Sequence, residues 1–149
     1  MRHLCDANIF IAAAVEDHPH HSIAKSWLDG LGGEDTAEFC RITQAAFLRL
    51  ISNAAVLKDN AVSNREAVAI YQKFLADGRV RFQSEPEGME TLWFKNAALE
   101  TKSPLIWTDA YLASFAHLLG MRFVTFDRGF TRYEGLDLLL LRGAPQAIS

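Results

Sequence analysis

Two aspartates follow short apolar runs near opposite ends of the chain. Asp6 lies in HLCDANIF at residues 3–10, and Asp127 lies in FVTFDRGF at residues 123–130. Each acid stands where a strand-like run gives way to a turn or a helix start. Carboxylate oxygens are the ligands that hard divalent cations prefer. The sequence therefore offers two potential metal ligands from equivalent local positions.

A third aspartate comes from a different kind of position. Asp109 belongs to TDAYLASFAHLLG, where Thr108 is the expected N-cap of a helix and Asp109 falls in its first turn, near the positive end of the helix dipole. Its neighbours Ala110 and Ala113 are small and leave room around the carboxylate. Three adjacent carboxylates would raise one another's pKa values unless a cation neutralised them. Oxygen ligands alone favour Mg²⁺ or Mn²⁺ over zinc.

Two polar residues are placed to support these acids. Asn8 follows Asp6 closely and can orient a carboxylate or a water molecule, and Thr125 precedes Asp127 by two residues on the same face of a strand. Polar partners of this kind hold the ligands of metal sites in place. Any one of the aspartates, taken alone, would be explained as a cap of the following turn or helix. Their convergence favours a site.

The elements that would position these residues alternate between strands and helices. Strands are expected at 2–6, 38–42, 80–82, 123–126 and 137–141, and helices at 8–15, 20–30, 43–53, 63–77, 87–99 and from 108 to Gly120. This alternation predicts an α/β fold in which helices cover both faces of a parallel sheet of four or five strands. Ligands of such sheets bind at the carboxyl ends of the strands, where the strand order reverses. Asp6 and Asp127 would face each other there if their strands are neighbours.

Composition sets outer limits on the class of protein. The chain has 149 residues, half of them hydrophobic, which predicts a single domain over residues 1–149 with its own core. The net charge of −3 argues against extensive wrapping of nucleic acid, although a compact site for it remains possible. Cys5 and Cys40 are expected to be buried thiols. With no apparent signal peptide or membrane span, a cytoplasmic protein is expected.

The three acidic segments together resemble a known family. DAN after the first strand, TDAYLASFA on a late helix and VTFDRGF on the next strand are similar to the successive acidic motifs of PIN domains, in the VapC toxin branch of bacterial type II toxin–antitoxin systems. The resemblance covers nearly the whole chain. It implies a PIN-like three-layer fold and a metal-dependent endoribonuclease, with Asp6, Asp109 and Asp127 as ligands of Mg²⁺, for which Mn²⁺ can substitute.

The same resemblance implies partners. Proteins of this family are usually homodimers held inactive by a cognate VapB-type antitoxin. Transfer RNA is the expected substrate, and ribosomal or messenger RNA is also compatible with a small acidic pocket that reads unstacked bases. No membrane association is implied.

One position departs from the family pattern. RITQAAFLRL places Gln44 where many relatives carry a glutamate, and Glu38 lies at the wrong end of its strand to replace that acid. Gln44 can offer an amide oxygen to a metal or to its water, but it brings no charge. We therefore expect Gln44 in the catalytic site, with weaker metal binding, and either one or two bound ions.

Basic residues near the motifs could hold RNA phosphates. Arg128 directly follows Asp127, and Arg49 lies five residues after Gln44. Arg41 is a further candidate, ranked after these two. Most surface arginines are merely solvated or paired with an acid, so these assignments are secondary to the aspartates.

Three functional hypotheses follow. The first is phosphodiester hydrolysis by a water molecule that a metal ion activates, in an endoribonuclease toxin. The second, motivated by Gln44, is a degenerate PIN module that binds RNA or an antitoxin without cleavage. The third is a phosphotransfer receiver or a haloacid-dehalogenase-like phosphatase. The absence of a DxDxT motif after the first strand, and of an evident lysine on a late strand, disfavours the third.

Overall fold

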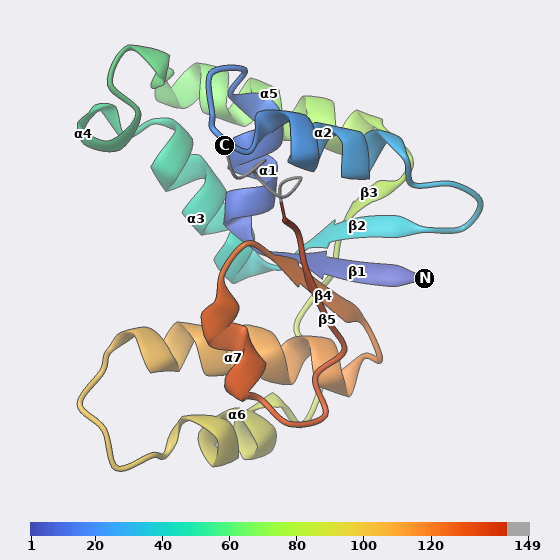
Figure 1. Cartoon of the computed structure of the whole chain (residues 1–149), viewed down its shortest axis with the longest axis vertical. Coiled ribbons are helices and arrows are strands. Elements are labelled where there is room, and N and C mark those ends of the chain that lie inside the picture. Colours follow the sequence, from blue (N-terminus) through green and yellow to red (C-terminus); the bar gives the residue numbers. More distant parts are fainter. Residues whose placement is uncertain (143–149) are drawn as a thin grey trace, which may run out of the picture.

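A five-stranded parallel sheet forms the centre of the molecule (Figure 1). The computed structural model describes residues 1–142, so the last seven residues of the expected 1–149 domain lie outside the described residues. The strands are β1 (Arg2–Cys5), β2 (Thr36–Phe39), β3 (Val80–Phe82), β4 (Arg122–Thr125) and β5 (Leu138–Leu140). Their order across the sheet is β3-β2-β1-β4-β5, and all four pairings are parallel. This confirms the predicted fold class.

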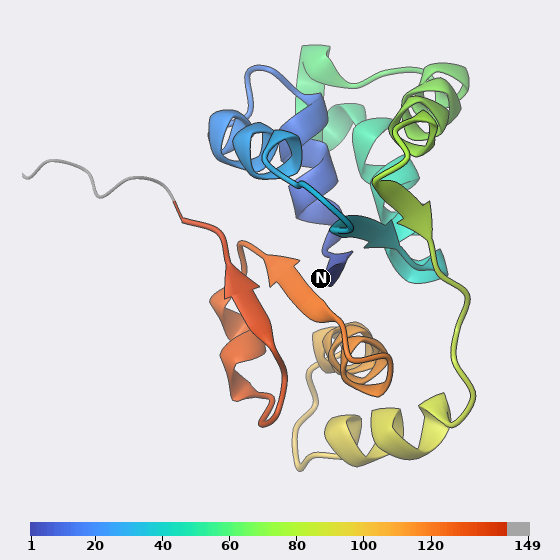
Figure 2. The same cartoon turned by 90° about the vertical axis from the view of Figure 1, so that its right-hand side faces the viewer.

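Helices cover both faces of the sheet, which gives three layers (Figure 2). One side carries α1 (Ala7–Ala14), α2 (His21–Asp29), α3 (Arg41–Ile51), α4 (Ala54–Leu57) and α5 (Asn64–Ala76), with the 3₁₀ helix η1 (Lys58–Asn60). The other side carries α6 (Met89–Ala97) and α7 (Leu105–Leu118), and the 3₁₀ helix η2 (Arg128–Arg132) follows β4. Within residues 1–142, no helix has both the length and the hydropathy needed to cross a bilayer.

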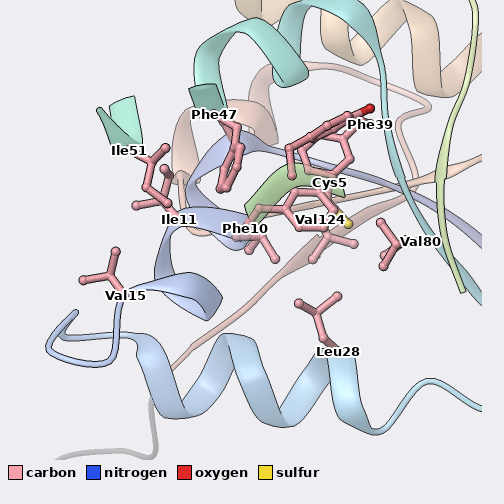
Figure 3. Packing of buried hydrophobic residues seen from close by; sticks show 14 of the residues in the cluster. Cys5, Phe10, Ile11, Val15, Leu28, Phe39, Phe47, Ile51, Val80 and Val124 are labelled. Atoms are coloured by element: carbon pink, nitrogen blue, oxygen red, sulfur yellow. The ribbon is translucent and has the colours of Figure 1, made fainter. Parts of the chain in front are cut away.

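Side chains of the strands alternate between two hydrophobic clusters, as the pleat of a sheet requires. Cys5 and Val124 pack with residues of α1, α2, α3 and α5, whereas their chain neighbours Leu4 and Phe123 pack with residues of α6 and α7. In the first cluster, the fully buried rings of Phe10 and Phe39 are stacked with their centroids 3.8 Å apart (Figure 3). Both cysteines are buried thiols, as expected. The two clusters hold the sheet rigidly between its helical layers.

The start of α7 differs from the prediction. The helix begins at Leu105 and Pro104 occupies the N-cap position, so Thr108 is not the cap and Asp109 lies in the second turn. Proline suits a helix start because its missing N–H would have no partner there. Ile106 is buried against α6, and this packing extends the helix toward its N-terminus. The expected stabilisation of Asp109 by the first turn is therefore wrong.

The junction between β2 and α3 also lies earlier than predicted. Arg41 was expected in a strand at 38–42 but is the first residue of α3. The hydroxyl of Thr43 accepts a 2.9 Å hydrogen bond from the backbone N–H of Cys40, which stabilises the helix start at this point. The short helices α4 and η1 were not predicted, because a four-residue or three-residue helix is too short to show a periodic pattern.

Candidate metal centre

The strand order reverses between β1 and β4, the two strands that carry the acidic motifs. Strands β2 and β3 lie successively on one side of β1, and the chain then crosses over so that β4 pairs with the other side of β1. The backbone N–H of Asp6 donates a 2.8 Å hydrogen bond to the carbonyl of Val124. The predicted proximity of the first strand and the FVTF strand is therefore observed, and their carboxyl ends form the expected ligand-binding edge.

One buried hydroxyl joins the polar residues of this edge. Thr125 Oγ1 donates to Asp6 Oδ2 at 2.7 Å and accepts the backbone N–H of Asp127 at 3.0 Å. It also accepts a longer bond, 3.4 Å, from the side-chain amide of Asn8. Thr125 has no exposed surface. The structure thus brings together four residues that the sequence singled out.

Asp6 is not explained as a helix cap. It occupies the N-cap position of α1, yet its side chain makes no capping hydrogen bond and turns to Thr125 instead. Burial raises the pKa of Asp6 to about 6, and the charges of Asp109 and Asp127 add to this rise, against the opposing effect of the Thr125 hydrogen bond. A neighbouring cation would stabilise the ionised form of this buried carboxyl group and lower its pKa.

Asp127 does act as a cap, but with only one of its oxygens. Asp127 Oδ1 accepts the backbone N–H of Gly129 at 2.8 Å and so fixes the start of η2. A Cβ atom at Gly129 would lie 3.1 Å from this oxygen. The glycine therefore lets the backbone approach the carboxylate closely, and the carboxylate is held in one orientation at the exposed edge.

Asp109 shares the electrostatic environment of the other two acids. Burial raises its pKa, the charge of Asp127 raises it further, and the guanidinium of Arg132 opposes the rise. The charge of Asp109 also contributes to the raised pKa of Asp6, so Asp109 belongs to the same electrostatic environment as the two strand-end acids.

The types of donor atom suit a hard cation, although the side chains do not converge on a common coordination site in residues 1–142. As they stand in residues 1–142, no three Asp, Glu, His or Cys side chains are arranged to hold a metal ion. The available donors are nonetheless all oxygens. Among the described residues, Asn8 Oδ1 is a buried oxygen without a hydrogen-bond partner. Carboxylate and amide oxygens fit Mg²⁺ or Mn²⁺, and Mg²⁺ commonly keeps several waters in its coordination shell.

Three other predicted residues, Gln44, Arg49 and Arg128, do not join this hydrogen-bonded group. The side-chain oxygen of Gln44 accepts a hydrogen bond from Arg41, whose guanidinium carbon lies 4.6 Å from the ring centroid of Phe82. Arg49 is exposed in the last turn of α3, and Arg128 is exposed beside Asp127. Arg128 is thus the chain neighbour of Asp127, and among the described residues neither Gln44 nor Arg49 makes a hydrogen bond to the three acids.

Two residues near the acids were missed by the sequence analysis. Arg132 Nε donates to the carbonyl of Gly129 at 2.9 Å, so η2 carries it back toward Asp109. The Tyr133 hydroxyl is buried without a hydrogen-bond partner in the described part of the chain, and burial followed by the charge of Asp109 raises its pKa. The Asp-Arg-Gly sequence at 127–129 signalled a turn, from which this return of the chain could have been suspected.

Comparison with known proteins gives the class first. The profile of the PIN domain matches residues 4–136, and the chain belongs to the PIN domain family. Within it, the chain is a VapC-family PIN ribonuclease. Ribonuclease VapC41 of Mycobacterium tuberculosis is 42% identical over 142 residues, which span 93% of this chain and 97% of that relative. Ribonuclease VapC38 of the same organism is 30% identical over 131 residues, or 85% of each chain.

Solved structures share the three-layer architecture. VapBC2 from Rickettsia felis, bound to a DNA fragment from its promoter, matches with a TM-score of 0.69 and 16% identity, covering 95% of this chain and 100% of that one. VapC20 of Mycobacterium tuberculosis, a sarcin-ricin loop cleaving toxin, matches with a TM-score of 0.66 and 14% identity, covering 91% and 97%. At these identities the similarity establishes the fold alone, and it confirms the PIN-like architecture.

Proposed function

We propose that this chain is an endoribonuclease toxin of a VapBC-type toxin–antitoxin system and that it hydrolyses RNA phosphodiester bonds with the help of Mg²⁺. The observation that carries the proposal is the link between Asp6 and Asp127 through Thr125 at the switch point of a PIN-family sheet. The charge of Asp109 acts on the pKa of Asp6 and supports its place beside them. The similarity over nearly the full length of ribonuclease VapC41 supports nuclease activity.

The side chains have distinct roles in this proposal. Asp6, Asp109 and Asp127 would hold the ion, with Mn²⁺ as a possible substitute, and a bound ion supplies an activated water and neutralises charge on the scissile phosphate. Thr125 orients Asp6 through its 2.7 Å hydrogen bond. The free oxygen of Asn8 can accept a hydrogen bond from a water molecule. Ligation by all three acids requires side-chain movement, or water molecules that complete the shell.

The substrate and partners follow from the same family. We infer that transfer RNA is cut, with phosphates held by Arg128 and by Arg132, both of which are exposed beside the acids. The VapBC structure among the similar folds supports a VapB-type antitoxin as partner. We also propose a homodimer, and an RNA substrate would place its activity in the cytoplasm.

A binding module without activity is the second candidate. It is favoured by Gln44, whose neutral side chain is engaged by Arg41, and by carboxylates that are not closed around a common point in residues 1–142. Such a module would bind RNA or antitoxin and show no metal-dependent turnover.

Cleavage assays distinguish the two candidates. Antitoxin-free protein is incubated with purified transfer RNA and ribosomal RNA in Mg²⁺, Mn²⁺ or EDTA, beside Asp6→Asn and the control Asp137→Asn. Asp137 is an exposed acid paired with Arg122 and lies away from the site, so its replacement should leave activity intact. Discrete fragments that need both metal and Asp6 would support the nuclease. Folded wild-type protein that yields no fragments with either metal would favour the binding module.

A further inference from the structure

A cavity of about 500 Å³ lies on the side of the sheet covered by α6 and α7. Leu92 and Asn96 of α6 line one wall, and Ala113 of α7 lines another. The third wall is made by Arg132 and Tyr133, at the end of η2 and just after it. The segment after η2 reaches α7, where His117 Nδ1 lies 3.2 Å from the carbonyl oxygen of Gly135, and its residues complete the lining of the cavity.

The cavity adjoins the proposed metal centre. Ala113 follows Asp109 by four residues, which is about one turn or 6 Å along the same face of α7. Arg132 and Tyr133 of the facing wall follow Asp127 closely in the chain, and Arg132 Nε donates to the carbonyl of Gly129 at 2.9 Å. A single strand whose phosphate lay at the acids would therefore have a neighbouring nucleotide within reach of the cavity.

The walls combine apolar surface with polar groups that lack full partners. Leu92, Leu99 and Leu136 supply apolar surface. The Asn96 amide donates to Ser114 Oγ at 2.9 Å, which leaves its carbonyl oxygen available as an acceptor. The Tyr133 hydroxyl is buried without a partner among the described residues. Apolar walls with a few convergent polar groups are typical of small-ligand sites of this volume.

The charges at the cavity favour a nucleotide over a purely apolar ligand. Lys95 and Arg132 are cations suited to phosphate oxygens. Glu134 is the one acid of the lining and can accept a hydrogen bond from an amino group on a base edge, and His117 adds a further polar ring. Unstacked bases of single-stranded RNA are read through such edge contacts and through packing of their faces.

We propose that this cavity is a subsite for one unstacked nucleobase of the RNA, next to the phosphate that is cut. The inference rests on the proposed function. The base packs on the leucine side chains, and its edge meets Asn96 and Tyr133. The subsite makes the choice of cleavage position depend on the identity of that base.

Filling the cavity tests this assignment. Leu92→Trp places a larger side chain on the α6 wall, and Val68→Trp is the matched control because Val68 is 45% exposed on α5, across the sheet. Each protein cuts a pool of RNA with randomised positions, and the cut ends are sequenced. Leu92→Trp should change the preference for one base beside the cut by about tenfold, which corresponds to about 1.4 kcal/mol of lost binding. The control should match the wild type. An unchanged preference in a folded Leu92→Trp protein would overturn the subsite.

A second measurement needs no change in the cavity. The Asp6→Asn protein is mixed in Mg²⁺ with RNA that carries photoreactive thio-substituted uridine or guanosine, irradiated and analysed by mass spectrometry. Crosslinks to residues 92–99 or 132–136 are expected. Crosslinks confined to other peptides, or no crosslinks, would overturn the subsite. If the wild type fails to cut RNA while these crosslinks form, the proposed cleavage fails and the base subsite stands.

Discussion

Thr125 Oγ1 lies 2.7 Å from Asp6 Oδ2 and donates a hydrogen bond to it across the junction of β1 and β4. Because the hydroxyl also accepts the backbone N–H of Asp127, it links the two strand-end acids of the site. The bond lowers the pKa of Asp6 and partly offsets the effect of burial. We propose that Thr125 acts as a positioning residue for the metal centre.

Replacement of Thr125 tests this role. Thr125→Val keeps the volume of a fully buried side chain but removes the donor to Asp6 and leaves the N–H of Asp127 without its acceptor. We expect metal affinity and cleavage rate to fall about 10–100-fold, the usual effect of losing a residue that orients a metal ligand. Mn²⁺ titration calorimetry and initial cleavage rates measure the two effects.

The conservative variant is the control for this experiment. Thr125→Ser retains the hydroxyl and should recover most of the lost affinity, because both hydrogen bonds can form again. If Thr125→Val bound Mn²⁺ as tightly as the wild type, the hydroxyl would have only a structural role.

The raised pKa of Asp6 predicts a pH-dependent stability in the absence of metal. Its folded pKa is about 6 against an ordinary value of 3.8, so between these values the folded protein keeps a proton that the unfolded chain has lost. This contribution is fully present below about pH 4 and is lost as the pH rises through 6, at a cost of about 3 kcal/mol by neutral pH. Urea unfolding in EDTA from about pH 4 to 7.5 measures the free energy of unfolding.

Asp6→Asn isolates this effect from the other titrating groups. The asparagine has no carboxyl group to ionise, so the stability of the variant relative to the wild type should increase as the pH rises. Mg²⁺ should stabilise the wild type but not the variant. Parallel curves for the two proteins in EDTA would show that the Asp6 carboxylate is not penalised by burial.

The layers of the fold and the grouping of Asp6, Thr125 and Asp127 could be predicted from local sequence, whereas the boundaries of several helices and strands could not. Alternating strands and helices, together with the acids at strand ends, were enough to predict the parallel sheet and the contact of Asp6 with the β4 segment. The start of α7 was misplaced because Thr108 was taken as the cap, although Pro104 is itself a helix-start signal, and the packing of Ile106 against α6 supports the earlier start.

The residues that surround the acids could also not be predicted from local sequence patterns. Arg132 and Tyr133 approach Asp109 only because η2 turns the chain back after Asp127. The pairing of Gln44 with Arg41 depends on α3 beginning at Arg41, two residues before the predicted start. Such effects depend on where an element begins, which periodicity locates least well.

Gly129 provides a test of how closely the backbone must approach Asp127. In Gly129→Ala, the new Cβ would lie 3.1 Å from Asp127 Oδ1, so the carboxylate must shift and its hydrogen bond to the backbone weakens. We expect cleavage to fall about tenfold or more, since small displacements of catalytic groups are costly. The fold should persist, because the change lies in an edge turn. Gly32→Ala is the control, as its Cβ would meet nothing within 4 Å. Equal activity of the two variants would show that the orientation of Asp127 does not limit catalysis.

Gln44→Glu tests whether α3 contributes to the metal centre. The substitution adds a carboxylate at the carboxyl end of β2, the strand beside β1. We expect Mn²⁺ to bind about tenfold more tightly if the first turns of α3 reach the ion, because a further negative charge at the same edge of the sheet favours the cation. Arg41, which donates to the Gln44 side chain, would pair with the new carboxylate and limit the gain.

A second substitution removes that competition. In the Arg41→Ala, Gln44→Glu double variant the carboxylate has lost its pairing partner, so Mn²⁺ affinity should exceed that of the single variant, while Arg41→Ala alone should stay close to the wild type. Calorimetric titration of the four proteins gives the coupling between the two positions. If the glutamate changes affinity in neither background, the first turns of α3 do not reach the ion, and the three aspartates must bind it without help from this helix.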